Sequence, residues 1–103
     1  MGKALVAFKS PGGKMLKISA ECTKNDCKIL IAGDFFLYPE ETVHALEASV
    51  ARAPALTSDS IQKQLDITLG LHQAELHGVT TREMASTIEE AIRNARKDEL
   101  AAH

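Results

Sequence analysis

The chain has 103 residues and a formal net charge of −2, a length that suits one domain with a single modest core. Hydrophobic residues make up 45% of it and charged residues 25%, which is typical of a globular protein and not of a disordered one. Lysine and arginine are spread along the sequence, so the charge pattern predicts neither a nucleic-acid-binding nor a membrane-binding protein. We expect a cytoplasmic protein, since no apolar run approaches the roughly 20 residues of a membrane span and the first residues lack the apolar stretch of a signal peptide.

The first third of the chain predicts three antiparallel strands. Residues 4–8 form a short apolar run that stops at the turn signal Ser10-Pro11-Gly12-Gly13. From Lys14 to residue 22 apolar and polar side chains alternate, which is the period of a strand buried on one side. Residues 28–32 are mostly aliphatic and predict a third strand. Because the connections are short, we expect the strands to pair as an antiparallel meander.

The remaining two thirds predict three helices. Pro39 suits the first position of one helix, which should end near Ala53-Pro54-Ala55. Thr57 and the residues after it offer N-caps for a second helix, and Thr80 with Glu83 forms a capping box that opens a third. The apolar stripe of this third helix consists of Met84, Ile88, Ala91, Ile92 and Ala95. Strands followed by helices indicate an α+β class, a small antiparallel three-stranded sheet with about three helices on one face, formed by residues 1–103 as a single domain.

Two cysteines flank the predicted turn at residues 23–26. If this turn closes a hairpin, Cys22 and Cys27 face each other and a disulfide is geometrically possible. We favour two reduced thiols in a reducing cytosol, with a hyperthermophilic source as the exception. Two cysteines supply only half of a zinc shell, and the four histidines show no ligand spacing that completes it. The sequence therefore predicts no metal site.

The loop Pro11-Gly12-Gly13-Lys14 is the first candidate site. Two glycines expose backbone N–H groups, and the lysine that follows them could neutralise a phosphate. The loop is not a P-loop, because Met15 stands where a serine or threonine is required and a strand pattern follows instead of a helix. A hairpin turn with a surface lysine is the simpler interpretation. Lys14 nevertheless shares the parity of Leu16 and Ile18, so its side chain should leave the sheet on the covered face.

Three of the four aromatic residues, Phe35, Phe36 and Tyr38, lie where the third predicted strand gives way to the first predicted helix. Scarce aromatics that gather in one place anchor either the chain's own core or the surface of a partner. Neighbouring side chains point to opposite sides of an extended chain, so Phe35 and Phe36 cannot both enter one core. At least one of the three aromatics should therefore face outward. For Asp34, which follows a glycine, we favour a turn-capping role.

Catalytic arrangements are missing from the sequence pattern. We find no Ser-His-Asp or Cys-His pairing with a supporting sequence context, and no isolated carboxylate pair in an apolar setting. The residues by themselves predict a binding or accessory domain without catalytic residues.

Two segments resemble a known family. Residues 10–18, Ser-Pro-Gly-Gly-Lys-Met-Leu-Lys-Ile, and residues 31–41, Ile-Ala-Gly-Asp-Phe-Phe-Leu-Tyr-Pro-Glu-Glu, resemble the C-terminal domain of lipoate–protein ligases. The likeness is strongest to the form that some archaea make as a separate small polypeptide. A looser similarity covers Leu76-His77-Gly78-Val79-Thr80, where that domain often carries a Gly-Val-Thr turn before its last helix. The Gly-Asp-Phe-Phe run is the most specific part of a resemblance that covers residues 10–95.

The resemblance implies a function that this chain cannot perform alone. In that family a large catalytic domain binds lipoate, ATP and Mg, forms lipoyl-adenylate, and then passes the lipoyl group to a lysine of an acceptor domain. The small domain resembles a movable cap that is needed for adenylation. This chain lacks the Arg-Arg-x-Ser-Gly-Gly-Gly lipoate-binding signature and the catalytic lysine region. The resemblance thus implies a non-catalytic subunit that binds no cofactor itself, forms a heterodimer with the catalytic large subunit and meets lipoyl acceptor domains only indirectly.

The ligase interpretation assigns a role to two groups of residues, and two alternative functions stand beside it. In the ligase interpretation, Gly12, Gly13 and Lys14 lie near the reacting phosphates, and a second group docks on the catalytic subunit. That docking group consists of Asp34, Phe35, Phe36 and Tyr38. The chain could instead be a stand-alone protein-interaction module that binds another protein through its aromatic corner and has no part in ligation. A small nucleic-acid binder is disfavoured by the net charge and by the absence of a basic stripe in the sequence.

Overall fold

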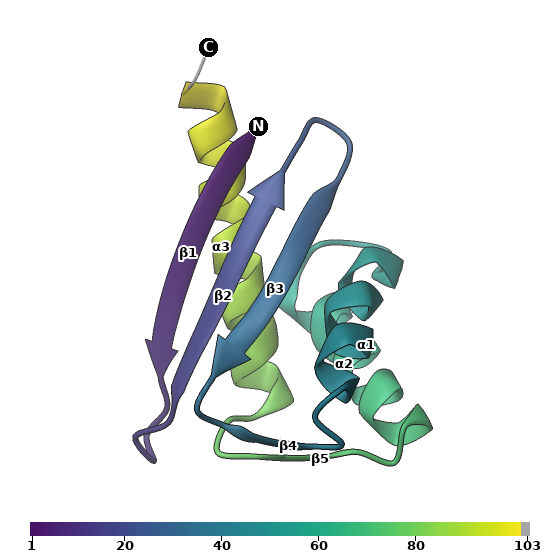
Figure 1. Cartoon of the computed structure of the whole chain (residues 1–103). Coiled ribbons are helices and arrows are strands. Elements are labelled where there is room, and N and C mark those ends of the chain that lie inside the picture. Colours follow the sequence, from purple (N-terminus) through teal and green to yellow (C-terminus); the bar gives the residue numbers. More distant parts are fainter. Residues whose placement is uncertain (102–103) are drawn as a thin grey trace.

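Three antiparallel strands open the chain, as the alternating pattern predicts. In the computed structural model, which describes residues 1–101 and the side chains of residues 1–98, β1 (Gly2–Lys9), β2 (Met15–Cys22) and β3 (Cys27–Gly33) form one sheet in the order β1-β2-β3. Figure 1 shows the three strands side by side with β2 in the middle. The outer edges of the sheet therefore belong to β1 and β3.

A helical layer covers one face of this sheet. It consists of α1 (Thr42–Ser49), the short 3-10 helix η1 (Val50–Arg52), α2 (Ser58–Leu71) and α3 (Thr81–Ala101). Helix α3 packs on β1 and β2, α1 packs on β3, and α2 lies against both α1 and α3 (Figure 1). This arrangement confirms the α+β class. None of the helices in the described part of the chain is long and apolar enough to cross a membrane.

The core lies between β2 and α3. The alternation in β2 directs one set of side chains to the helices, and all four of them are completely buried: Leu16, Ile18, Ala20 and Cys22. The predicted stripe of α3 meets them, with Ile88 completely buried and Ile92 only 4% exposed. Burying an aliphatic side chain of this size stabilises the fold by about 1.5–3 kcal/mol. The sequence pattern therefore predicted the faces that form the core.

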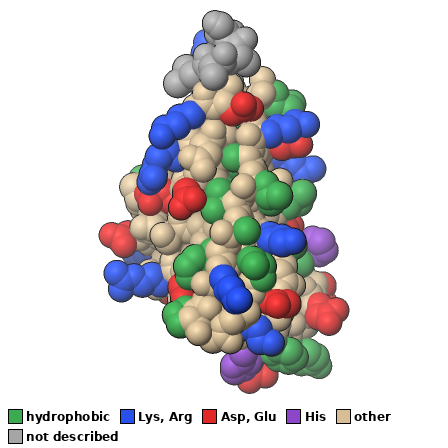
Figure 2. Space-filling view, turned by 90° about the vertical axis from the view of Figure 1, so that its left-hand side faces the viewer, with side chains coloured by type: hydrophobic (Ala, Val, Ile, Leu, Met, Phe, Trp, Pro, Cys, Tyr) green, Lys and Arg blue, Asp and Glu red, His purple; other side chains and the backbone are tan. Residues whose placement is uncertain are grey.

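The uncovered face of the sheet gathers lysines that are far apart in the sequence. Lys3, Lys9, Lys17 and Lys28 all lie exposed on it, because every second residue of a strand shares a face. Lys3 contacts Glu21 at 3.6 Å between two exposed side chains. Figure 2, which looks onto the β1 side of the molecule, shows hydrophobic side chains among basic and acidic ones. Strand pairing thus concentrates charges that the linear sequence spreads out.

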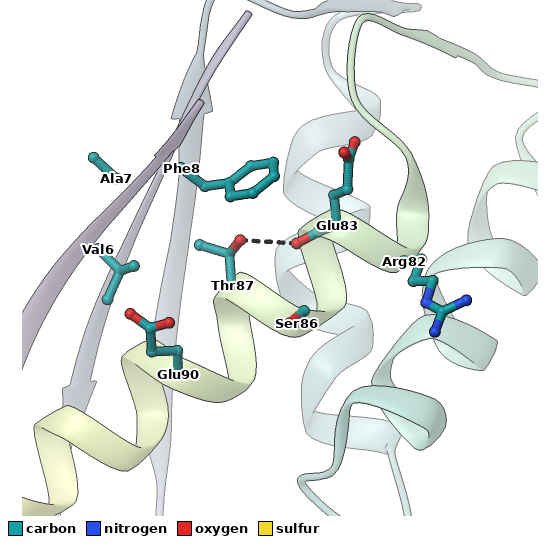
Figure 3. A pocket seen from close by; sticks show the side chains of 8 residues that line it. All are labelled: Val6, Ala7, Phe8, Arg82, Glu83, Ser86, Thr87 and Glu90. Atoms are coloured by element: carbon teal, nitrogen blue, oxygen red, sulfur yellow. Dashed lines mark hydrogen bonds between the residues drawn. The ribbon is translucent and has the colours of Figure 1, made fainter. Parts of the chain in front are cut away.

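A groove of about 380 Å³ runs between β1 and α3. Figure 3 shows Val6 and Phe8 on its strand side, facing residues from the first turns of α3, while the side chain of Ala7 between them points away from the helix. The residues from α3 are Arg82, Glu83, Ser86, Thr87 and Glu90. Val6 and Phe8 are only half-buried, so the groove leaves apolar surface accessible along the edge of the sheet.

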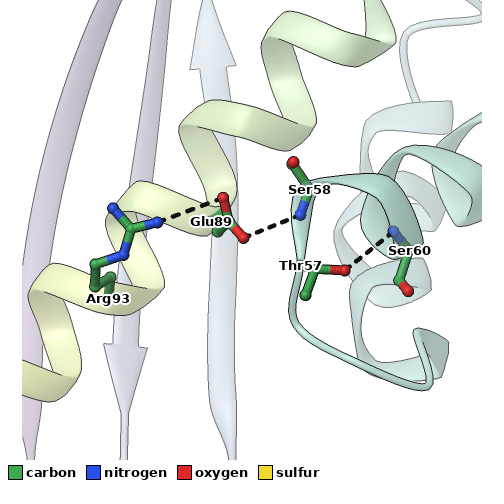
Figure 4. Close-up of polar contacts among 5 residues, drawn as sticks. All are labelled: Thr57, Ser58, Ser60, Glu89 and Arg93. Atoms are coloured by element: carbon green, nitrogen blue, oxygen red, sulfur yellow. Dashed lines mark hydrogen bonds and ion pairs between the residues drawn. The ribbon is translucent and has the colours of Figure 1, made fainter.

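Polar contacts cap the start of α2 and join it to α3 (Figure 4). Thr57 caps α2 by accepting the N–H of Ser60 at 3.4 Å. Glu89 of α3 accepts the N–H of Ser58 at 3.1 Å and contacts the guanidinium of Arg93 at 3.4 Å, so it ties the start of α2 to α3.

The predicted capping box is present at the start of α3. There the N–H of Thr80 donates to the carboxylate of Glu83 at 2.9 Å, and the N–H of Glu83 donates to the Thr80 hydroxyl at 3.0 Å.

A second, two-stranded sheet was not predicted. Strand β4 (Phe36–Tyr38) pairs with β5 (Glu75–His77), and α1 begins at Thr42 instead of Pro39. The residues before α1 form a turn in which the N–H of Thr42 donates to the carbonyl of Pro39 at 3.0 Å. Each strand has only three residues and pairs with a distant segment, so neither carries a local pattern that would predict it.

The expectation of two reduced thiols is wrong, because Cys22 and Cys27 form a disulfide. The two residues are direct partners at the last position of the β2–β3 ladder, with Cα atoms 4.1 Å apart. The turn between them closes through the N–H of Thr23, which donates to the carbonyl of Asp26 at 2.7 Å. The hairpin that the sequence predicted therefore brings the two sulfur atoms together.

Candidate functional site

The two predicted segments meet at one end of the sheet, where β2 begins and β3 ends. The N–H of Asp34 donates to the carbonyl of Met15 at 3.0 Å, and the Asp34 carboxylate accepts the N–H of Met15. The Asp34 side chain thus binds a backbone group of β2 instead of capping its own turn, which differs from the predicted role. This pair of hydrogen bonds places the aromatic segment directly beside the loop that carries Lys14.

Gly33 makes this close approach possible. Its φ of +150° lies outside the range of ordinary L-residues, and a Cβ at this position would come within 2.2 Å of the Met15 carbonyl oxygen. A side chain at position 33 would therefore push β3 away from the start of β2. The close contact between the two segments therefore requires a glycine at this position of the Gly-Asp-Phe-Phe run.

Ser10 organises the loop at residues 11–14. Its N–H donates to the Lys14 carbonyl at 2.8 Å, its carbonyl accepts the N–H of Gly13 at 2.9 Å, and its hydroxyl accepts the N–H of Lys14 at 3.1 Å. Ser10 is almost completely buried, whereas Gly12, Gly13 and Lys14 are exposed. The loop therefore already uses the N–H groups of Gly13 and Lys14. A ligand would meet the N–H of Gly12 and the ammonium of Lys14.

The first carbons of the Lys14 side chain pack beside Gly78. A Cβ on Gly78 would lie 3.0 Å from Cγ of Lys14 and 3.5 Å from the Cα of Phe35. Gly78 has a φ of +99°, which favours glycine, and it lies just before the capping box of α3. Lys14 therefore extends toward the helix-covered side of the sheet, as its parity predicts. The same contact joins the third segment of the family resemblance to the first two.

The aromatic residues divide between the core and the surface. Phe35 is half-buried and packs against the core, while Leu37 is 6% exposed. Phe36 and Tyr38 are 53% and 62% exposed on the other side of β4. The ring of Phe36 lies 5.7 Å from the ring of His77, its partner in β5. The prediction that at least one aromatic faces outward is confirmed, and two of them do.

An apolar hollow adjoins these aromatics. It has a volume of about 320 Å³ and lies between the end of β3, β4 and α1. The side chains and backbone around it come from Ile31, Ala32, Gly33, Phe35, Phe36, Leu37, Glu40 and Val43. An exposed aromatic beside an apolar hollow is the kind of surface on which protein partners dock.

The groups exposed at this end of the molecule are polar and aromatic. Within the described residues, no group of three or more His, Cys, Asp or Glu side chains could hold a metal ion. His44 lies 3.5 Å from Glu47, and His77 lies 3.8 Å from Glu75, both on exposed histidine side chains. His103 lies outside the described residues. The site presents the ammonium of Lys14, the N–H of Gly12, and the exposed rings of Phe36 and Tyr38.

Sequence reasoning missed two contributors to this site. The sequence pattern marks Ser10 only as part of a turn signal, although a serine hydroxyl can hydrogen-bond to the turn that follows it. The sequence pattern places Gly78 in a turn, and its contact with Lys14 depends on the tertiary fold.

No protein-family model, no curated protein and no solved structure matches this chain.

Proposed function

We propose that this chain is the accessory subunit of a two-component, ATP-dependent lipoate–protein ligase. It binds the catalytic large subunit as a heterodimer and is needed for the activation of lipoate to lipoyl-adenylate, which precedes lipoylation of acceptor proteins. The proposal places the complex in the cytoplasm. The disulfide between Cys22 and Cys27 fits this compartment best in a hyperthermophilic cell, where intracellular disulfides are common.

One observation carries the proposal. The three segments that resemble the accessory domain of these ligases come together at one end of the fold, although they are far apart in the sequence. Met15 and Asp34 exchange hydrogen bonds, and the Lys14 side chain packs beside Gly78. The three segments therefore form one continuous surface, as a shared function would require.

The surface has the chemistry that a cap over an adenylation site needs. Adenylation joins a carboxylate to a nucleoside triphosphate and releases pyrophosphate, so negative charge develops on the leaving group. The ammonium of Lys14 and the N–H of Gly12 would offset that charge while the cap excludes water. The catalytic subunit would hold ATP, Mg and lipoate. Phe36 and Tyr38 would supply the apolar contact that docks the cap.

The main test is reconstitution. We expect lipoyl-adenylate and pyrophosphate to form only when this chain is mixed with a lipoate–protein ligase catalytic subunit that lacks its own C-terminal domain. Each protein alone should be inactive. Equal pyrophosphate release with and without this chain, at concentrations where the two proteins bind, would overturn the proposal.

Lys14→Ala tests the role of the lysine. We expect slower adenylation by roughly tenfold, which is less than the 10²–10³ typical of a donor in a fully preorganised site, because Lys14 is exposed. Transfer from pre-made lipoyl-adenylate should not change. Lys17→Ala is the matched control, since Lys17 lies on the uncovered face of the sheet. If Lys14→Ala and Lys17→Ala adenylate equally fast, Lys14 has no such role.

The exposed aromatics also support the alternative of a stand-alone interaction module. Phe36→Ala with Tyr38→Ala should abolish binding to the catalytic subunit without changing the stability of the chain, because both side chains are more than half exposed. A pull-down with the catalytic subunit distinguishes the two functions. Failure of the unmodified chain to bind it would favour a module that recognises a different protein.

A further inference from the structure

The free edge of β1 carries unpaired backbone groups. The N–H of Lys3 donates to the Asp98 carboxylate at 3.0 Å, so it points away from β2. In an antiparallel strand alternate residues direct both N–H and C=O to the same side. Leu5 and Ala7 therefore also direct their backbone groups outward. Among the described residues, we find no hydrogen bond to the N–H of Leu5 or Ala7 from that side.

Apolar side chains lie along the β1 edge on both faces of the sheet. Leu5 is 70% exposed on the uncovered face, and the half-buried side chains of Val6 and Phe8 line the groove above α3 (Figure 3). β1 has eight residues and no proline. A long, regular strand edge of this kind is a template for pairing with another strand.

We propose that a second copy of this chain occupies the β1 edge, with the two β1 strands antiparallel across a two-fold axis that passes beside Ala7. The two three-stranded sheets then form one continuous sheet of six strands, and the two copies of α3 lie antiparallel on the same side of it. Such an interface is isologous, because each residue contacts the same set of residues in the other copy. This assembly is independent of the proposed ligase function.

The charges of β1 and the bond between Lys3 and Asp98 disfavour a neighbouring register. A two-fold axis beside Ala7 places Leu5 opposite Lys9 of the second copy, so the exposed leucine packs on the aliphatic stem of a lysine. A register centred on Val6 would place Lys3 opposite Lys9 of the second copy, and like charges directly opposed destabilise a strand pair. It would also compete with Asp98 for the N–H of Lys3. The register at Ala7 avoids both conflicts and pairs the outward groups of Leu5, Ala7 and Lys9.

The side of α3 that borders the groove carries charges that would complement those of the same side in a second copy. Arg82, Ser86 and Glu90 recur every fourth residue, are exposed, and line the α3 side of the groove (Figure 3). Among the described side chains, none of opposite charge lies within 4 Å of Arg82 or Glu90. When the two helices are antiparallel about Ser86, Arg82 of each copy faces Glu90 of the other. Ser86 is small, so it permits the helices to approach at the axis.

Sedimentation equilibrium with charge-reversed variants of the full chain tests the proposal. An interface of one strand pair and one helix flank is small, so we expect a dissociation constant of roughly 1–100 μM. Arg82→Glu and Glu90→Arg should each weaken the dimer about tenfold or more, and the double variant should restore it. A mixture of the two single variants should form heterodimers. Lys63→Glu, an equal charge change on the exposed side of α2, should have no effect.

Cysteine cross-linking tests the register directly. Ala7→Cys should give a disulfide-linked dimer under mild oxidation, because position 7 faces itself across the axis. Ala32→Cys is the matched control, since Ala32 is an exposed alanine on the same face in β3. It should stay monomeric. A chain that is monomeric at roughly 1 mM, a dimer unaffected by either charge reversal, or equal cross-linking of the two cysteine variants would each overturn the proposal.

Discussion

The two edges of the main sheet are protected in different ways. On β3 the outward N–H of Ile31 donates to Glu47 of α1 at 2.7 Å, and the Glu47 side chain is only 16% exposed. On β1 the corresponding bond joins Lys3 to Asp98, and it lies at the exposed start of the strand. The helical layer thus covers the edge of β3 and leaves most of the β1 edge open. β1 is held to the fold by its pairing with β2 and by α3, which packs on its face.

This difference determines which edge of the sheet is accessible to a strand of another molecule. Native proteins block strand edges with charges, proline, bulges or covering elements, because an open edge invites pairing. The β3 edge follows this rule, and the disulfide ties its first residue to β2. The β1 edge does not, apart from its terminal lysines. β1 is therefore the edge of the sheet that is open to pairing.

The largest expected effect concerns the face that holds β1. Ile88→Ala should lower the free energy of unfolding by about 2–5 kcal/mol, since it removes a completely buried side chain of α3 and leaves a cavity beneath the sheet. Ile67→Ala is the matched control, because Ile67 is 45% exposed on α2. Chemical denaturation of both variants measures the difference. Equal losses for the two variants would mean that α3 does not hold the β1 side.

The next effect concerns the covered edge. Glu47→Ala should lower the free energy of unfolding by about 1.5–3 kcal/mol, because the part-buried N–H of Ile31 loses a charged acceptor. Glu47→Gln keeps an acceptor and should lose less. His44→Ala separates this bond from the exposed contact between His44 and Glu47 and should be nearly neutral. If His44→Ala is as damaging as Glu47→Ala, the edge contact is not the stabilising element.

The disulfide is expected to contribute about 2 kcal/mol through the chain entropy of its short loop, in which the two cysteines are five positions apart. Reduction of the folded protein should lower the free energy of unfolding by this amount, and Cys22→Ala with Cys27→Ala should reproduce the loss. Thermal unfolding with and without a reducing agent measures it. Detection of two free thiols in the freshly purified, unfolded chain would restore the interpretation of reduced cysteines.

Regular patterns allowed most of the fold to be predicted. The alternation in β2 and the four-residue spacing of α3 each repeat often enough to fix a face, and both faces are buried as expected. The capping box of Thr80 and Glu83 is a local signal and is present. The paired strands β4 and β5 have three residues each. So short a segment has no period, and its partner is chosen by the fold of the residues between them.

The candidate site was predicted as separate segments. Lys14 and the outward aromatics could be named from parity, since strand geometry fixes direction locally. Their meeting depends on the contact of Lys14 with Gly78 and on the bonds between Met15 and Asp34. Those contacts follow from strand pairing and from the path of the chain into α3, which no local pattern specifies. The cluster of lysines on the uncovered face was missed for the same reason.

The smallest expected effect tests the open edge itself. Asp98→Ala removes the acceptor of the Lys3 N–H, an exposed bond, and should lower the free energy of unfolding by at most about 1 kcal/mol. Hydrogen exchange at a concentration where the chain is monomeric should show rapid exchange at Leu5 and Ala7 and slow exchange at Ile31, and the variant should add Lys3 to the rapid group. Asn94→Ala, a change at an exposed position one turn earlier on α3, is the control. A loss equal to that of Glu47→Ala, or slow exchange at Leu5 and Ala7 in the monomer, would show that the β1 edge is closed within one chain. The difference between the two edges, and with it the case for pairing through β1, would then disappear.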